Sequence, residues 1–134
     1  MKSEKLLHSD VTDRVLKGFF HAYSTLGYGF LEKVYENALA LTLKKYNLSV
    51  GQQVPVKVHF EGELVGDYFA DLIVDGCVLV ELKAAEAIAP AREAQLLNYL
   101  RATDVEVGLL LNFGPKPEFS RRVFSNERKG GQKH

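Results

Sequence analysis

The chain contains no tryptophan, one cysteine and one methionine among its 134 residues, and it carries no net charge at neutral pH. The lone cysteine, Cys77, has no intrachain disulfide partner, which favours a reduced, cytoplasmic setting. Zero net charge argues against a strong, non-specific binder of nucleic acid. No apolar run approaches the ~20 residues that span a membrane, and residues 1–10 lack the apolar segment of a signal peptide. We therefore expect no membrane partner.

Hydrophobic residues make up 46% of the sequence, which is enough for a single core at this length. We expect one domain over residues 1–124, followed by a disordered basic tail over residues 125–134. The segment from residue 115 to residue 134 holds six basic and two acidic residues, so the charge is unevenly spread. This basic segment is either a solvated tail or a local contact for phosphate groups.

Hydrophobic periodicity predicts an α/β fold with a mixed sheet flanked by helices. The predicted elements are helices at residues 10–26, 30–46 and 90–102, and strands at residues 54–60, 64–74, 77–83 and 105–113. A strand, a helix and a second strand in close succession form a right-handed crossover, so the last strand should run parallel to the strand at 77–83. The segment 119–124, which carries Arg121 and Arg122, is either a short helix or a strand.

The segment from Tyr68 to Lys83 is predicted to form an apolar hairpin, yet it contains three ionisable residues, Asp71, Glu81 and Lys83. Its centre, Asp75-Gly76, is the kind of dipeptide that most strongly predicts a tight hairpin turn. Charged side chains inside such strands are costly unless they are paired, bind a metal or face water. Some interaction must therefore hold these three side chains.

The length of the turn decides whether the three charged side chains meet. Side chains alternate along a strand, so Glu81 and Lys83 lie on one face. Asp71 joins them if the loop has an odd number of residues, for example Val74-Asp75-Gly76, whereas a two-residue turn sends it to the opposite face. The first geometry gathers two carboxylates and an ammonium, the components of a site for a hard divalent cation beside a phosphate. Crowding should then raise the pKa of at least one carboxylate.

Asp71 followed by Glu81-Leu82-Lys83 resembles the core of the PD-(D/E)xK nuclease superfamily. The sequence Gly29-x-x-Glu32-x-x-Tyr35 resembles the signature of the GxxExxY proteins of that superfamily, and later segments of the chain are also similar to theirs. Those segments are Gln95-Leu-Leu-Asn-Tyr99 and Gly108-Leu-Leu-Leu-Asn-Phe-Gly114. The resemblance covers about residues 10–124. Ala70 stands where the superfamily name has proline, but proline coordinates nothing.

The resemblance implies a restriction-endonuclease-like αβββαβ core and a nuclease that uses Mg²⁺ or Mn²⁺ to hydrolyse phosphodiester bonds, of DNA rather than RNA. The implied metal ligands are Asp71, Glu81, the carbonyl of Leu82 and the helix-borne Glu32. Lys83 would position the attacking water or steady the charge that grows on the phosphorane, and Gln95 would help to orient that water. The expected contacts to nucleic acid are Arg92, Tyr99, Arg121 and Arg122.

Each of these assignments has a simpler alternative. Glu32 lies in the first turn of a helix, where it would complement the helix dipole without binding metal. Gln95 and Tyr99 share a helix face, and they are alternatively a surface and a core residue. Glu81 and Lys83 could form a structural ion-pair network. The whole domain could also be a non-catalytic module that binds nucleic acid or a protein partner, or it could form a homo-oligomer.

Overall fold

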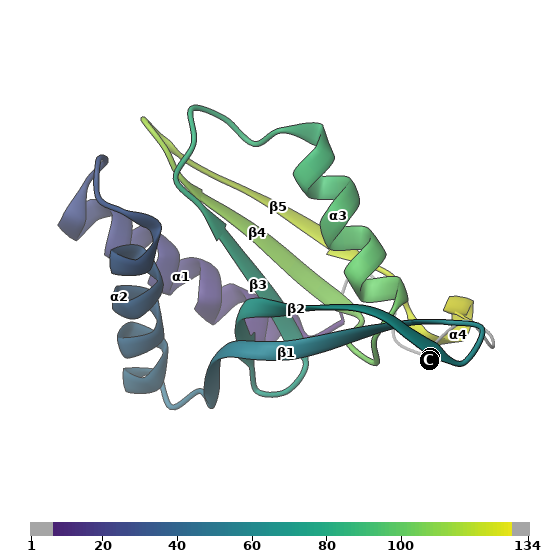
Figure 1. The fold of residues 1–134 in the computed structure, drawn as a ribbon. Coiled ribbons are helices and arrows are strands. Elements are labelled where there is room, and N and C mark those ends of the chain that lie inside the picture. Colours follow the sequence, from purple (N-terminus) through teal and green to yellow (C-terminus); the bar gives the residue numbers. More distant parts are fainter. Residues whose placement is uncertain (1–6, 130–134) are drawn as a thin grey trace.

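A computed structural model describes residues 7–129, which form five strands and four helices (Figure 1). The helices are α1 (Ser9–Leu26), α2 (Glu32–Lys45), α3 (Pro90–Arg101) and α4 (Asn126–Lys129). The strands are β1 (Val50–Phe60), β2 (Glu63–Val74), β3 (Val78–Lys83), β4 (Val107–Phe113) and β5 (Pro117–Val123). Apart from their ends, the predicted helices and strands are confirmed. The segment with Arg121 and Arg122, which the sequence left open, is a strand.

The strands form one mixed sheet in the order β1-β2-β3-β4-β5. β3 and β4 are parallel, as the crossover through α3 predicts, and all other neighbours are antiparallel. β4 is buried along its whole length, which explains its continuous apolar sequence. The expected α/β fold with a restriction-endonuclease-like core is confirmed.

Helices cover both faces of the sheet (Figure 1). α1 and α2 pack on one face through a large core that includes Phe19, Tyr35 and Phe113, and α3 packs on the other through Leu96 and Leu100. α3 approaches β4 closely because Gly108 has no side chain beneath Leu96. No helix within residues 7–129 is long and apolar enough to cross a membrane.

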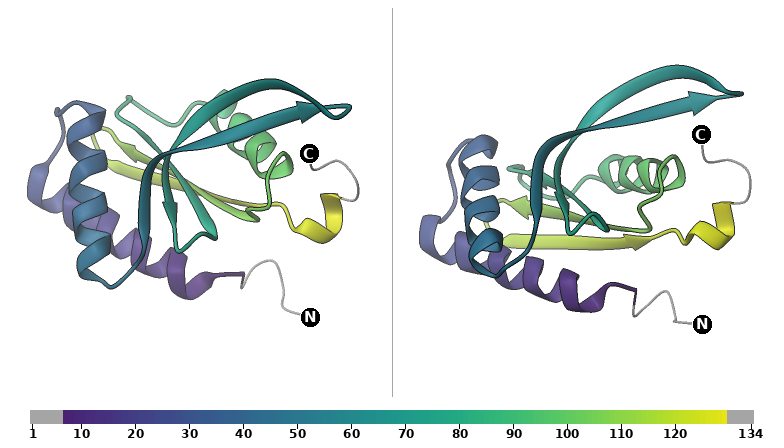
Figure 2. Two further views of the ribbon diagram at one scale, coloured as in Figure 1. Left: turned by 60° about the horizontal axis from the view of Figure 1, so that its bottom comes forward. Right: turned by 90° about the horizontal axis from the view of Figure 1, so that it is seen from below.

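β1 and β2 extend beyond the sheet as a two-stranded arm, residues 54–70, which passes over α3 (Figure 2). The arm bends away at Gln53, which has a positive φ of 52° and does not pair with Asp71, although the register is the same on either side. β2 consequently pairs with β3 only from Leu72 to Val74. From Asp71 towards the start of β2, the strands β2 and β3 separate, and we call the point where they separate the fork.

The C-terminal end and the lone cysteine differ from expectation. We expected a disordered tail from residue 125, but Ser125 is buried and α4 follows it. The Lys129 ammonium is buried and donates hydrogen bonds to the carbonyls of Thr103 and Val105, which anchors α4; residues 130–134 of the expected tail lie outside the described residues. Cys77 lies in the turn after β2, partly exposed, and not in the predicted core strand.

Candidate active site

The turn between β2 and β3 places Asp71 and Glu81 on the same face of the sheet. Asp75 and Gly76 both have positive φ, 51° and 67°, and the Val74 carbonyl accepts a hydrogen bond from the amide of Cys77. Val74 then pairs with Val78, so the loop has three residues, Asp75 to Cys77. The predicted odd-numbered loop is confirmed, one residue further along the chain than expected. Continuing this register puts Asp71 opposite Glu81.

The two carboxylates replace backbone pairing that is lost at the fork. The amide of Asp71 donates to Oε2 of Glu81 over 3.2 Å, and the amide of Leu82 donates to Oδ2 of Asp71 over 2.8 Å. Amide and carbonyl of one residue point to the same side of a strand, so the Leu82 carbonyl also faces the opening. Three oxygen-bearing groups therefore converge where β2 leaves β3.

Glu81 has a pKa raised to about 7. Burial is the largest cause, the charge of Asp71 is the second, and the hydrogen bond from the Asp71 amide and the charge of Lys83 both oppose the rise. The expectation of a raised carboxylate pKa is confirmed, with burial contributing more than repulsion. Within residues 7–129 neither Glu81 nor Lys83 forms an ion pair, so the structural ion-pair alternative has no support here.

A cavity of about 310 Å³ lies beside the carboxylates. Its charged lining residues are Glu32 at the start of α2, Lys83 at the end of β3 and Arg92 on α3. Lys83 lies two residues after Glu81 on β3, and the charge of Glu32 adds to the raised pKa of Glu81. Among the described residues, however, no three acidic, histidine or cysteine side chains are close enough together to hold a metal. Glu32 thus faces the site without completing a three-carboxylate cluster.

A family model described as the PD-(D/E)XK nuclease superfamily matches residues 9–123. The chain belongs to the PD-(D/E)XK nuclease superfamily. Among solved structures, the crystal structure of SSO0001 is similar, with a TM-score of 0.55 and 18% sequence identity. The match covers 70% of this chain and 50% of that one, and at this identity it shows a shared fold alone. A comparison with curated proteins finds no match.

Nucleases of the PD-(D/E)XK superfamily generally use divalent metals, and the residues at the fork fit such an ion. The donors are oxygens only, from Asp71, Glu81 and the Leu82 carbonyl. Hard cations such as Mg²⁺ prefer oxygen, and Mg²⁺ commonly binds through one or two carboxylates and keeps several waters. A pair of carboxylates is therefore sufficient, and a third from Glu32 is not required.

The spacing Gly29-x-x-Glu32-x-x-Tyr35 has a structural explanation in this superfamily member. Gly29 has a φ of 117°, which glycine adopts readily. The hydroxyl of Tyr35, which is fully buried, accepts from the Phe30 amide over 3.1 Å and donates to the Gly27 carbonyl over 2.5 Å. The glycine shapes the loop and the tyrosine holds it, and together they place Glu32 at the start of α2.

A hydrogen-bonded network behind Asp71 was not predicted. Glu36 is buried on α2 and accepts from the side-chain amides of Gln52 and Gln53, over 2.8 and 2.9 Å. Gln53 also donates to Oδ1 of Asp71 over 3.2 Å, so both Asp71 oxygens are held. Neither Glu36 nor Gln53 was among the residues predicted for the site. The sequence signal for this network is limited to two adjacent glutamines near the start of the strand.

Gln95 and Tyr99 lie on the α3 face beneath the arm. Tyr99 stacks on Tyr68 of β2, with ring centroids 3.6 Å apart, and the charge of Glu81 raises its pKa in addition to burial. Gln95 is exposed, and its side chain makes no hydrogen bond within the described part of the chain. The structure thus brings Tyr99 to the carboxylates, while the role of Gln95 stays a prediction.

Arg121 and Arg122 do not form one basic surface. They are neighbours on β5, so their side chains leave opposite faces of the sheet. Arg121 donates to the carbonyl of Leu7, and Arg122 pairs with Glu93 of α3 over 3.1 Å. Their contact with nucleic acid stays a prediction, and each would have to make it from a different face of the sheet. Lys83 and Arg92 remain as the cations that face the cavity.

The loop after β3 is held in place by hydrogen bonds from β4. Asn112 is buried, and its side chain accepts from the Ala85 amide and donates to the Ala85 carbonyl, each over 3.0 Å. A side chain at Gly114 would collide with that carbonyl. These contacts explain why the segment Gly108–Gly114 contains asparagine and glycine, and they hold the loop that forms one wall of the cavity.

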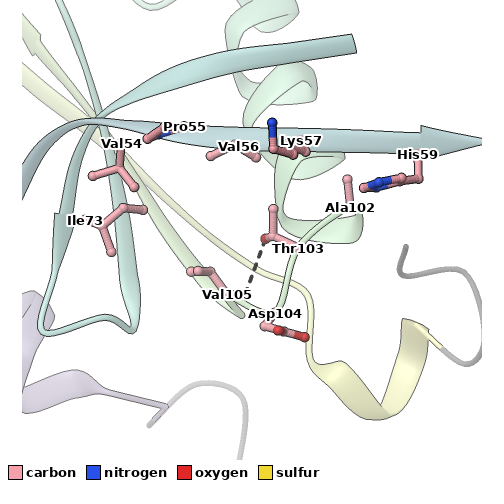
Figure 3. Close-up of a pocket in the computed structure, with 10 residues that line it drawn as sticks. All are labelled: Val54, Pro55, Val56, Lys57, His59, Ile73, Ala102, Thr103, Asp104 and Val105. Atoms are coloured by element: carbon pink, nitrogen blue, oxygen red, sulfur yellow. Dashed lines mark hydrogen bonds between the residues drawn. The ribbon is translucent and has the colours of Figure 1, made fainter. Parts of the chain in front are cut away.

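A second, larger cavity of about 380 Å³ lies between β1 and the turn that joins α3 to β4 (Figure 3). Aliphatic side chains such as Val54, Ile73 and Val105 form much of its lining. Neither Asp71 nor Glu81 lines either cavity, but Glu32 and Lys83, whose charges act on Glu81, line the smaller one. The smaller cavity is therefore the one next to the pair of carboxylates.

Proposed function

We propose that this protein is a divalent-metal-dependent nuclease that hydrolyses phosphodiester bonds, with DNA as the first substrate to test. The observation that carries the proposal is the fork, where Asp71 and Glu81 face one another beside Lys83, which forms no ion pair within residues 7–129. Membership of the nuclease superfamily supports it independently. The pattern of Gly29, Glu32 and Tyr35 supports assignment to the GxxExxY proteins of that superfamily.

Asp71, Glu81 and the Leu82 carbonyl would hold Mg²⁺ or Mn²⁺, with Glu32 available through a bridging water. When bound, such an ion polarises a phosphate oxygen and lowers the pKa of a coordinated water. The hydrogen bonds from Gln53 and from the Leu82 amide hold the Asp71 carboxylate in place before any ligand arrives. This preorganisation avoids a conformational cost when the site binds its substrate.

Lys83 and Arg92 supply the positive charge. The Lys83 ammonium lies on the same strand face as Glu81, where it would stabilise the negative charge that grows on the phosphate in the transition state. Arg92 lines the opposite wall of the cavity and would contact a neighbouring phosphate. Gln95 and Tyr99 approach from α3, from where they would orient the attacking water or the substrate.

We expect Asp71→Asn to abolish Mn²⁺ binding, because the substitution removes one of two negative charges and turns an acceptor oxygen into a donor group. Calorimetric titration of the purified protein with Mn²⁺ measures this directly. Asp67→Asn, which neutralises an exposed carboxylate on the arm, is the matched control and should bind like the wild type. Equal Mn²⁺ affinity in Asp71→Asn and the wild type would show that the fork is not a metal site.

A further inference from the structure

Exposed apolar side chains gather in the loop just before Glu32, a lining residue of the smaller cavity, and we call this loop the mouth of the cavity. Tyr28, Phe30 and Leu31 lie just before α2 with exposed fractions of 54%, 47% and 79%. The Tyr28 hydroxyl donates to Glu86 over 3.2 Å, so the loop before α2 contacts the loop that walls the cavity. Exposed aromatic rings next to a basic groove are the surfaces on which proteins stack unpaired bases.

The interior of this cavity matches one nucleoside. Ala87, Ile88 and Leu110 form apolar walls, while Lys83 and Arg92 contribute positive charge that exceeds the negative charge of Glu32. Its volume of about 310 Å³ is at the lower end for small-ligand sites, so it cannot admit a base pair. Two residues on a strand, such as Glu81 and Lys83, are ~7 Å apart, which places the cavity about one nucleotide from the carboxylates.

The distribution of charge also disfavours a continuous duplex. Duplex binders neutralise several phosphates on both strands, and this chain has no net positive charge. Arg122 is paired with Glu93, which leaves Lys83 and Arg92 as the cavity's cations. The stacked pair Tyr68–Tyr99 closes the side of the site beneath the arm. Because Glu81 is only partly buried and lies next to the cavity, a phosphate at Glu81 places its neighbouring nucleoside at the cavity.

From these observations we infer that the substrate is an unpaired nucleic-acid strand, whose nucleoside next to the scissile phosphate occupies this cavity and stacks at its aromatic mouth. The inference rests on the proposed nuclease function and specifies its substrate class. It assigns Tyr28 and Phe30 to base stacking and Arg92 to a flanking phosphate, while Lys83 acts on the scissile phosphate. Unpaired strands include single strands, overhangs and flaps, and all share this chemistry.

The test uses a fluorescent DNA strand of about 15 nucleotides, alone and annealed to its complement, in metal-free buffer. We expect the single strand to bind at least about tenfold more tightly than the duplex. Ala87→Phe, which fills the cavity from an exposed loop position, should remove that preference, whereas Ala94→Phe on the outer surface of α3 should keep it. Tyr28→Ala should weaken single-strand binding on the order of tenfold without filling the cavity.

Two outcomes separate this inference from the function on which it rests. Equal binding and cleavage of duplex and single strand, or an unchanged preference in Ala87→Phe with a normal melting temperature, would overturn the inference and leave the nuclease intact. Absence of binding and of cleavage for both probes, with Mg²⁺ or Mn²⁺ added, would overturn the nuclease proposal and the inference together.

A separate observation concerns Tyr68, which no sequence motif indicated. Its hydroxyl is buried and has no hydrogen-bond partner among the described residues. Burial, together with the charges of Glu81 and Asp71, raises its pKa, so the hydroxyl stays protonated close to both carboxylates. Glu81 uses Oε2 for the Asp71 amide, and its Oε1 accepts no hydrogen bond within residues 7–129.

We propose that the Tyr68 hydroxyl is a positioning group that donates a hydrogen bond to Glu81, or to a water beside it, when the site is loaded. A buried donor without a partner costs stability in the empty protein, so its presence calls for such a role. The ring stack with Tyr99 fixes the direction of the hydroxyl. Groups that orient a metal ligand through a hydrogen bond typically contribute about ten- to a hundredfold in metal affinity or activity.

Tyr68→Phe removes the hydroxyl and keeps the ring stack. We expect about a tenfold loss of Mn²⁺ affinity or of kcat with KM unchanged, and an equal or higher melting temperature without metal. Tyr46→Phe, a hydroxyl deletion at the end of α2, should change neither Mn²⁺ affinity nor kcat. A lower melting temperature with unchanged Mn²⁺ affinity and kcat would show that Tyr68 is only structural.

Discussion

Lys83→Ala should abolish cleavage of nucleic acid while leaving its binding nearly unchanged. The Lys83 ammonium lies on the face of β3 that carries Glu81, it lines the cavity, and no described acidic residue forms an ion pair with it. Removing one group that stabilises charge in the transition state typically costs on the order of a hundred- to a thousandfold in kcat. A loss that is equal in kcat and in kcat/KM identifies a group that acts mainly in the transition state.

The measurement is single-strand cleavage with Mn²⁺ or Mg²⁺, compared with binding of the same strand in metal-free buffer. Lys57→Ala, which removes a lysine from the exposed arm, is the matched control and should cut like the wild type. A proportional loss of binding and cleavage in Lys83→Ala would mean that the lysine only holds the substrate. A wild type that binds nucleic acid but cuts none with either metal would favour the non-catalytic binding module.

Much of the fold could be predicted because it depends on local patterns. Alternation of side chains places Glu81 and Lys83 on one face in any strand, and an Asp-Gly dipeptide restricts the turn to a few lengths. A continuous apolar segment such as β4 indicates a strand covered on both faces. These inferences need no knowledge of distant parts of the chain, and the structure confirms them.

The fork could not be predicted, because it depends on how two long strands bend. The bend requires Gln53, a residue that rarely adopts positive φ, and it exposes backbone amides that Asp71 and Glu81 then satisfy. Glu36 joins this site only through Gln52 and Gln53, across two elements that are separated in sequence. Sequence periodicity shows which face a residue occupies but not where neighbouring strands part.

The two basic residues of β5 are adjacent in sequence but separated in space. Arg121 and Arg122 are adjacent in sequence, and a strand necessarily separates them onto opposite faces. Their contact partners are Leu7, which lies just before α1, and Glu93, which lies on α3. Clustering of charge along the chain therefore gave no cluster in space, and positive charge at the site comes instead from two separate elements, β3 and α3.

Glu81→Gln should stabilise the metal-free protein at pH 8 and remove most of the pH dependence of its stability. The folded protein raises the pKa of Glu81 from 4.5 to about 7, chiefly through burial. Between these two values the unfolded chain has lost the proton and the folded chain retains it, so the stability of the wild type falls as pH rises through this window. A shift of this size corresponds to roughly 3 kcal/mol.

Glutamine can accept the hydrogen bond from the Asp71 amide through its side-chain oxygen, so Glu81→Gln removes the charge and keeps the contact. For a chain of this length the expected rise in melting temperature at pH 8 is ~5 to 10 °C, vanishing near pH 4. Differential scanning calorimetry in a chelating buffer measures it, with Asp67→Asn as the exposed-carboxylate control. A structural role for Glu81 predicts the reverse, a loss of melting temperature at every pH, because a paired and buried charge would have been removed. A rise in melting temperature at pH 8 would therefore show that the Glu81 carboxylate lowers the stability of the folded protein. That result is expected of a group that is retained for its chemistry.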